Sequence, residues 1–355
     1  MHRWLGLSLG AVLFVSSTMG GLLVAQREFA EFAERSLTIV APRAQRVPLA
    51  AIVSAVQARA PEGLRLRSLI FDPDPAHAVR AQLTSMPIHP RYVSRLENRQ
   101  MYASVDPYTG RILAFREENS VPDRWVRTMH VTLFAGRAGV IATTLASFAL
   151  VLQGLGGVWI YRGAINALRR NPFRYRLGLR IALGDAHRWL GVAGLALSLS
   201  WGATGAFMMV YSLPSLLAPA GRPKPFSMPT WNANRSPALE PMVSTARNNF
   251  PTAELAEIDL PLASGEPVVV SLLQRDAAIW AKFPGAEFDS ATGALLRIIR
   301  PADNGFLDKV QASIKPLHFG YYGARWLKWT YFACAWIPAI LFVSGFSIWC
   351  LRRRN

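Results

Sequence analysis

The sequence predicts a membrane protein in which four transmembrane α-helices form two parallel repeats, with two small α+β domains outside the membrane. Three observations lead to this fold class. The 355-residue chain is 51% hydrophobic and has a positive mean hydropathy, which is unusual for a soluble globular protein. Its uncharged residues gather in four long blocks, and the motif His-Arg-Trp-Leu-Gly occurs twice, at residues 2–6 and 187–191.

Each uncharged block is long enough to cross a membrane. An α-helix needs roughly 20 residues to span a hydrocarbon core about 30 Å thick. The uncharged blocks are 4–26, 138–161, 189–221 and 329–351. Including the motifs that open them, the predicted spans are 1–26, 130–162, 187–214 and 318–351.

The first block has an alternative interpretation as a cleavable signal peptide. Met1-His-Arg is a short basic start followed by an apolar run, which is typical of such a peptide. Cleavage near Val24 or Ala25 would remove His2. The uncharged run is long for a signal core, and the repeat requires the helix, so we expect the span to be retained.

The charge distribution predicts which segments face the cytoplasm. The net charge is +17, but it is not gathered in a nucleic-acid-binding tract. Arginine-rich short segments stay on the cytoplasmic side during insertion. The loop 163–186 and the tail 352–355 are therefore predicted to be cytoplasmic, together with both termini, and the segments 27–129 and 215–317 lie outside. The predicted cytoplasmic segments and the helix ends beside them contain Arg3 and ten further arginines: Arg162, Arg169, Arg170, Arg174, Arg176, Arg180, Arg188, Arg352, Arg353 and Arg354.

An internal repeat relates the two halves of the chain. His2 and His187 are 185 positions apart, and His130 and His318 are 188 positions apart. The motif Asp-x-x-Thr-Gly ends each external segment, at 106–110 and 289–293. Motifs that recur in the same order and at nearly the same spacing indicate an internal duplication. Each copy contains an even number of spans, so both insert in the same orientation, related by an axis along the membrane normal.

The external segments have the apolar patterns of small α+β domains. We expect helices at 48–60 and 239–249, and a hairpin around each Asp-x-x-Thr-Gly turn. The predicted strands are 64–71, 101–105, 111–115, 267–273, 279–283, 286–289 and 294–299. The proline-rich segment 217–237 is predicted to be extended loop.

These motifs together resemble the PepSY-associated transmembrane family. The hairpin with Asp-x-x-Thr-Gly is similar to the PepSY module, and the openings at 2–6, 129–139, 187–191 and 317–323 are similar to that family's helix starts. The resemblance covers nearly the whole chain. It implies a bacterial inner-membrane protein with two periplasmic PepSY-like domains. It further implies haem between the helices and reduction of ferric siderophores in the periplasm.

The histidines at the span openings are the candidate cofactor ligands. Haem iron can be held by two neutral imidazoles on opposite faces of the porphyrin. Repeat symmetry predicts that His2 pairs with His187 and His130 with His318, each pair holding one b-type haem, so that one or two haems are expected per chain. Interfacial histidines that only contact lipid headgroups are the alternative. His77 and His89 are predicted to be surface residues.

Four arginines are candidate partners for the haem propionates. They are Arg3, Arg137, Arg188 and Arg325. A guanidinium matches the geometry of a carboxylate, although headgroup contact is an equally simple role for each. Six glycines beside the histidine motifs are candidates for close approach of a macrocycle or of a neighbouring helix: Gly6, Gly136, Gly139, Gly191, Gly320 and Gly323.

The sequence predicts no nucleotide site, no zinc site and no hydrolase triad, and no catalytic residue is identified. The resulting hypothesis is a haem-containing oxidoreductase that passes electrons to a ferric siderophore or another Fe(III) chelate. Its electrons would come from quinol or from a separate reductase. Two alternatives remain open, a non-catalytic PepSY regulator of a periplasmic partner and a b-type cytochrome with another acceptor.

Overall fold

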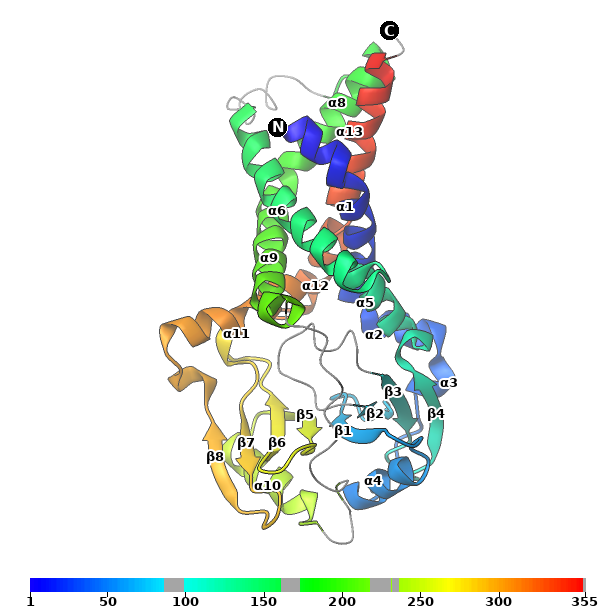
Figure 1. Cartoon of the computed structure of the whole chain (residues 1–355), viewed down its shortest axis with the longest axis vertical. Coiled ribbons are helices and arrows are strands. Elements are labelled where there is room, and N and C mark those ends of the chain that lie inside the picture. The colour runs from blue at the N-terminus through cyan, green and yellow to red at the C-terminus, as the bar shows by residue number, and fades with distance from the viewer. Residues whose placement is uncertain (86–98, 161–172, 218–230, 232–235, 354–355) are drawn as a thin grey trace. The chain divides into compact units, whose positions relative to one another are not determined.

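The chain divides into two compact units, each described here by itself. The computed structural model describes residues 1–85, 99–160, 173–217, 231 and 236–353 (Figure 1). The membrane unit comprises Met1–Gln26, Trp125–Leu213 and Ile314–Asn355, and the sheet unit comprises Arg27–Arg124 and Pro214–Ser313. His89, Arg162, Arg169, Arg170 and Arg354 lie outside the described residues, as does most of the predicted loop 217–237.

The membrane unit contains long apolar helices. Within the described residues, three are long and apolar enough to cross a membrane: α1 (His2–Val24), α6 (Gly136–Ile160) and the run from Arg325 to Arg353, which comprises α12 (Arg325–Cys334) and α13 (Ile337–Arg353). A fourth span results if α8 (Leu179–Ala193) and α9 (Leu195–Leu217) are counted as one bent pair. Three or four spans fit a membrane protein.

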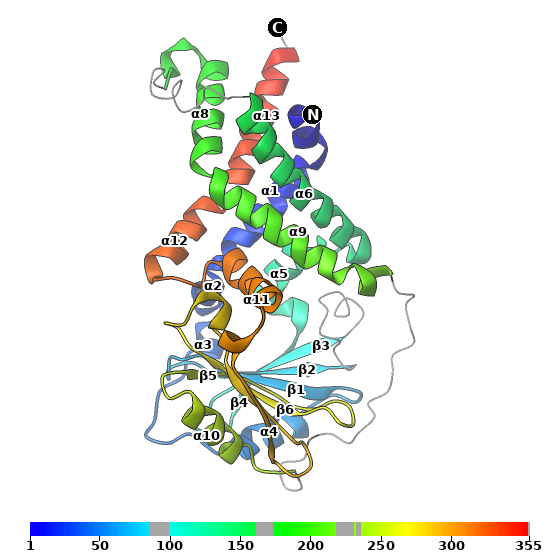
Figure 2. The ribbon, with the colours of Figure 1, turned by 90° about the vertical axis from the view of Figure 1, so that its left-hand side faces the viewer.

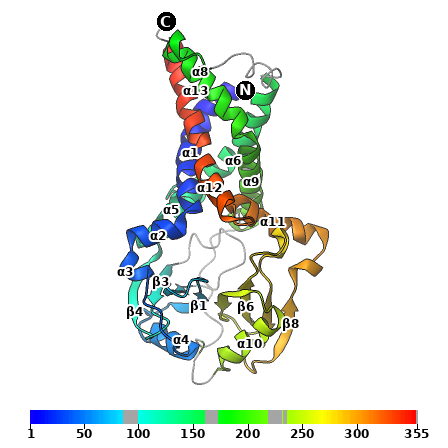
Figure 3. The same ribbon diagram turned by 180° about the vertical axis from the view of Figure 1, so that it is seen from behind.

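The predicted third span is bent. The axes of α8 and α9 differ by 65° at Gly194, where a Cβ would lie 2.8 Å from two side-chain carbons of Ile337. The absence of a side chain at this position lets α13 pack against the bend. Figure 3 shows α8 alongside α13, and the two helices are in contact.

His130 and His318 lie at the ends of separate helices that precede the apolar ones, rather than opening them as the sequence predicted. His130 is in α5 (Pro122–Thr132) and His318 is in α11 (Phe306–Phe319). After α5 the chain turns through Leu133, Phe134 and Gly136, all at positive φ, and after α11 it turns at Gly320, with φ +74°. These turns end one helix before the next begins.

Small residues bring the membrane helices close together. α1 packs against α6 and α13. A Cβ at Gly10 would fall on the Phe342 ring, and one at Gly202 would lie 2.8 Å from Val151 Cγ2. Such close backbone approach is typical of helix packing in lipid, where burial of apolar surface gives no driving force.

The sheet unit is built on one antiparallel sheet. The described residues form eight strands in the order β4-β3-β2-β1-β5-β6-β7-β8. Their bounds are β1 Arg65–Ile70, β2 Val79–Thr84, β3 Gln100–Val105, β4 Ile112–Glu117, β5 Glu254–Asp259, β6 Val268–Leu273, β7 Gly285–Phe288 and β8 Leu295–Ile299. The sequence predicted two separate domains, but pairing of β1 with β5 joins the two halves into one sheet.

Two helices cover one face of the sheet and form its core. They are α4 (Leu49–Ala58) and α10 (Leu239–Asn249), on the same side in Figure 2. Val53, Leu69, Ile258 and Leu272 of this core are fully buried. The remaining short elements are α2 (Gln26–Ala33), α3 (Arg35–Thr38) and 3₁₀ turns at Glu118–Ser120, Tyr175–Leu177, Ile279–Ala281 and Pro301–Asp303.

Two local predictions for the sheet unit were wrong. Residues 279–283 form no strand: Ile279–Ala281 is a 3₁₀ turn, and pairing with β6 starts at Gly285, after Pro284, which has no N–H to donate. His77 is not a surface residue, since its side chain is 9% exposed and its Nε2 lies 2.9 Å from Glu31 Oε1.

Candidate cofactor site

Four histidines of the membrane unit meet in two pairs. The ring centroids of His2 and His187 are 6.3 Å apart, and those of His130 and His318 are 6.2 Å apart. In each pair one histidine comes from the first half of the chain and the other from the second half. The structure therefore brings together the residues that the repeat symmetry matches.

The two histidines of the first half are held by main-chain carbonyls. His2 Nδ1 lies 3.1 Å from Gln153 O in α6. His130 Nδ1 lies 2.7 Å from Ser16 O in α1. A carbonyl oxygen can only accept a hydrogen bond, so Nδ1 carries the proton in both rings.

The two histidines of the second half contact hydroxyl groups. His187 Nδ1 lies 2.9 Å from Ser344 Oγ, and His318 Nδ1 lies 2.9 Å from Thr204 Oγ1. Each hydroxyl donates its own proton to a helical carbonyl, Ser344 to Leu341 O at 3.1 Å and Thr204 to Ser200 O at 2.6 Å. The hydroxyl lone pair is left to accept from Nδ1–H.

All four rings thus present the same chemistry. With Nδ1 protonated and hydrogen-bonded, the lone pair of each neutral imidazole is on Nε2. Histidines that bind metals are almost always oriented in this way by a hydrogen bond from the other ring nitrogen. The four Nε2 atoms are therefore suited to ligate a metal.

The spacing of the rings also fits iron held between two imidazoles. With a metal–nitrogen bond of about 2.0 Å and about 1.2 Å from that nitrogen to the ring centre, centroids on opposite sides of one metal lie ~6.4 Å apart. The two observed separations, 6.3 Å and 6.2 Å, are close to this value.

A glycine lies beside each histidine ring. A Cβ at Gly20 would lie 3.0 Å from Cε1 of His130, and one at Gly205 would lie 3.6 Å from Cε1 of His318. The corresponding distances are 3.8 Å from Gly157 to His2 and 3.4 Å from Gly345 to His187. These glycines leave the ring edges free of side chains, as a flat macrocycle beside the histidines requires.

Sequence reasoning missed these four glycines, although the repeat contained the signal. Gly20 and Gly205 are 185 positions apart, like His2 and His187, and Gly157 and Gly345 are 188 apart, like His130 and His318. Of the glycines proposed from the motifs, Gly139 instead packs on Thr132 O, and Gly320 packs on the Tyr331 ring.

The four arginines predicted to contact a cofactor have varied surroundings. The Arg188 guanidinium contacts the buried Asp185 carboxylate, and the Arg3 guanidinium lies 4.9 Å from the centre of the Trp4 ring. Arg137 is half-buried near the start of α6, and Arg325 is exposed at the start of α12. Arg188 is thus engaged in an ion pair that the sequence did not indicate.

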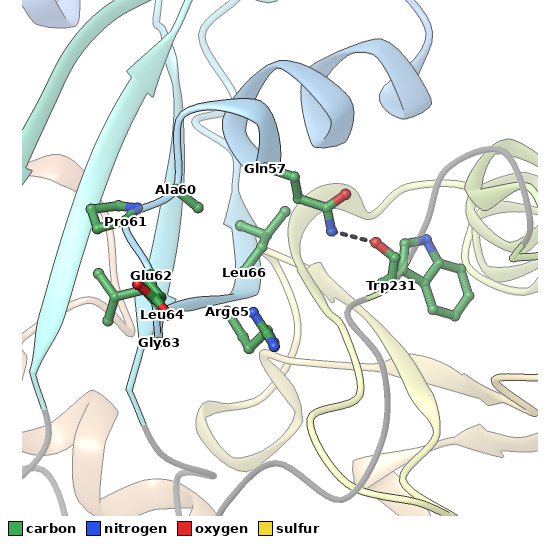
Figure 4. Close-up of a pocket in the computed structure, with 9 residues that line it drawn as sticks. All are labelled: Gln57, Ala60, Pro61, Glu62, Gly63, Leu64, Arg65, Leu66 and Trp231. Carbon is green, nitrogen blue, oxygen red and sulfur yellow. Dashed lines mark hydrogen bonds between the residues drawn. The ribbon is translucent and has the colours of Figure 1, made fainter.

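The sheet unit has a cavity of about 480 Å³ (Figure 4). Leu66 and the backbone around Gly63 line it, together with Arg65, Gln57 and Trp231. Gln57 Nε2 donates a hydrogen bond to Trp231 O, which ties this residue to α4. The lining also contains the Glu62 carboxylate, so it combines charges of both signs with apolar groups.

Comparison with known proteins gives two matches. A family model described as the PepSY-associated TM region matches residues 1–352. An uncharacterized protein of Pseudomonas aeruginosa is 28% identical over 256 residues, which cover 64% of this chain. The chain spans 63% of that relative's length.

Proposed function

Because the chain belongs to the family of the PepSY-associated TM region, we propose that it is a haem-containing oxidoreductase of the bacterial inner membrane that delivers electrons to an Fe(III) chelate such as a ferric siderophore. The family match confirms the resemblance that the motifs indicated. The oxidoreductase activity is what we propose. The observation that supports it best is the pairing of four histidines across the two halves, with each Nδ1 hydrogen-bonded.

The chain's own groups have defined roles in this proposal. His2 with His187, and His130 with His318, would each hold one b-type haem through Nε2, and Arg3, Arg137 and Arg325 are candidate propionate partners. Haem iron with two imidazole ligands supplies one-electron chemistry. The Nδ1–H bonds fix the orientation of the imidazoles, so little rearrangement is required of the protein when an electron passes.

The acceptor is proposed to bind the sheet unit on the periplasmic side. The proposed place is the cavity beside Arg65 and Trp231, whose lining has an apolar wall and both a guanidinium and the Glu62 carboxylate. Reduction lowers the charge of the iron and weakens its bonds to hard oxygen ligands, which favours release. Quinol or a separate reductase would supply the electrons.

A pyridine haemochrome assay on the purified, detergent-solubilised protein tests cofactor binding. We expect two haems per chain in the wild type, and one in each of His130→Ala and His318→Ala. His77→Ala, which removes a histidine of the sheet unit, is the matched control and should retain both. A folded wild-type protein without a Soret band would exclude the oxidoreductase and favour a regulatory role.

The acceptor is tested separately by stopped-flow reoxidation of the reduced protein. Ferric chelates should reoxidise the haem faster than quinone does. If quinone is the faster oxidant and ferric chelates have no effect, the protein is a cytochrome with another acceptor.

A further inference from the structure

We infer that Thr204 and Ser344 are positioning residues, each of which fixes the proton and sets the donor strength of one haem ligand. This inference rests on the proposed function. Thr204 Oγ1 is 2.9 Å from His318 Nδ1, and Ser344 Oγ is 2.9 Å from His187 Nδ1. In both cases a hydroxyl stands between the imidazole and a helical carbonyl.

This hydroxyl relay occurs only in the second half of the chain. At the offsets of 185 and 188 found for the histidines, Thr204 corresponds to Met19 and Ser344 to Gly156. Neither residue has a hydroxyl group. The histidines of the first half bond to carbonyls directly, through Ser16 O and Gln153 O. The His130/His318 pair therefore combines one direct bond with one relayed bond. In the other pair, His187 contacts both the Ser344 hydroxyl and the Leu341 carbonyl to which that hydroxyl donates.

The two kinds of bond differ in what they permit. A carbonyl only accepts, so it holds the proton on Nδ1 in every state of the protein. A hydroxyl accepts from Nδ1–H only while its own proton is directed elsewhere. The carbonyls of Ser200 and Leu341 take that proton, at 2.6 and 3.1 Å, so the lone pair of each hydroxyl faces the histidine.

Burial makes each hydroxyl hard to replace. The exposed fraction is 5% for Thr204 and 4% for Ser344. Water has little access to either site, so removing the Thr204 hydroxyl would leave the buried Nδ1–H of His318 without an acceptor. Removing the Ser344 hydroxyl would leave His187 with the Leu341 carbonyl alone, a smaller loss. An imidazole without that bond donates less electron density to a metal, and loss of such an outer partner typically weakens metal binding by about 10–100-fold.

The experiment compares Thr204→Val and Ser344→Ala with the wild type in a spectroelectrochemical titration. Thr204→Val should raise the midpoint potential of one haem, and Ser344→Ala that of the other, since a weaker donor stabilises ferric iron less. A tenfold loss of preference for the ferric state corresponds to a rise of about 59 mV for one electron. The affected haem should also dissociate more readily, by about 10–100-fold.

Two further variants separate positioning from general stability. Thr204→Ser keeps the hydroxyl and should restore the wild-type potential. Thr144→Val removes a hydroxyl that donates to Val140 O at 2.7 Å within α6, and should change neither potential. If Thr204→Val and Ser344→Ala leave both potentials and the low-spin electron paramagnetic resonance spectrum unchanged, the inference is wrong.

A haem-free preparation provides an independent readout. In ¹⁵N-histidine NMR spectra, Thr204→Val should shift the Nδ1 resonance of His318 and leave that of His130 in place. Failure of the wild type to bind haem would end the proposed function, whereas an unchanged His318 resonance would end this inference alone.

Discussion

The turns after His130 and His318 are held by hydrogen bonds from different residues. In the first half, Ser16 Oγ donates to His130 O at 3.4 Å, and Thr143 Oγ1 donates to Val131 O at 2.9 Å. In the second half, Trp201 Nε1 donates to His318 O at 3.1 Å, and Tyr331 OH donates to Leu317 O at 3.0 Å. Ser16 corresponds to Trp201, and Thr143 to Tyr331, at the two repeat offsets.

The two turns also differ in the residues that take a positive φ. In the first half, Leu133 and Phe134 have φ of 50° and 54°, a conformation that costs a residue with a Cβ about 1–2 kcal/mol. In the second half Gly320 takes the positive φ, and its missing Cβ makes room for the Tyr331 ring. The halves thus share the bonded carbonyl of His130 and His318, but not the second one, because Val131 corresponds to Phe319 rather than to Leu317. The donors have diverged from hydroxyls to aromatic side chains.

The largest difference in stability between the two halves should follow from removing the side chains that donate these hydrogen bonds. Tyr331 is 1% exposed and packs in a T-shape on Trp201, so Tyr331→Ala should lower the free energy of unfolding by about 4 kcal/mol through cavity formation. Thr143→Ala loses one hydrogen bond and should cost about 1 kcal/mol. Unfolding of the solubilised protein in mixed micelles, followed by circular dichroism, measures both.

Tyr331→Phe is the control, because it keeps the ring and loses only the hydrogen bonds of the hydroxyl group, with Leu317 O and Tyr322 OH. It should cost about 1 kcal/mol, like Thr143→Ala. Equal losses for Tyr331→Ala and Thr143→Ala would contradict the view that the second half depends on its aromatic packing.

Charged pairs in the sheet unit should give the next largest difference. Asp123 is 3% exposed and lies 2.9 Å from Arg80 and 3.3 Å from Arg124. Asp123→Asn should cost about 3 kcal/mol by leaving these two partly buried cations without their shared carboxylate. Glu287 bonds the exposed Arg297 at 2.7 Å, and Glu287→Gln should cost at most about 1 kcal/mol. Hydrogen exchange of the β2 and β7 amides measures the loss of stability in each variant. Similar losses for Asp123→Asn and Glu287→Gln would contradict the expected difference between a buried and an exposed carboxylate.

The acid dependence of Asp123 sharpens this test. Burial raises the pKa of this carboxyl, but Arg124 and Arg80 outweigh it, so the pKa lies below its usual value. A depressed pKa stabilises the fold above the unfolded pKa of about 3.9, and the contribution is lost as the pH falls through the folded pKa. The difference between wild type and Asp123→Asn should therefore be constant near neutral pH and shrink below about pH 4.

The two Asp-x-x-Thr-Gly turns should show the smallest difference. Gly110 and Gly293 have φ of 71° and 75°, so alanine is strained at both, by about 1 kcal/mol. At Gly293 the added Cβ would also lie 2.9 Å from Pro237 Cβ, whereas at Gly110 it would lie 3.8 Å from Val47 Cγ2. Gly293→Ala should therefore be the more destabilising by about 1 kcal/mol in thermal unfolding, and the reverse order would show that Pro237 moves aside freely.

The sequence was informative about the histidines because side chains repeat visibly. Two offsets matched His2 with His187 and His130 with His318, and the structure brings these residues together. Their hydrogen-bond partners were less predictable. Gln153 and Ser16 take part through main-chain carbonyls, which no residue type reveals.

Other features depended on contacts distant in sequence. Hydropathy located the long helices, but it did not reveal that His130 and His318 lie near the ends of helices of their own, because the histidine motifs were read as the openings of the spans. Strands β2 and β5 were missed because their alternating patterns are short and contain charged residues. Pairing of β1 with β5, 193 residues apart at Arg67 and Leu260, has no local signal.

The centre of the sheet has the symmetry of a dimer. Both β1 and β5 have a bulge, at Leu66/Ser68 and at Leu255/Glu257. Aligned on these bulges, Leu69 faces its own counterpart Ile258, while Ser68 pairs with Asp259 and Ile70 with Glu257, so the partners exchange places across the pair. This reciprocity is the hallmark of an isologous contact between identical subunits. Half of this chain therefore has the strand edge needed to pair with a second copy of itself.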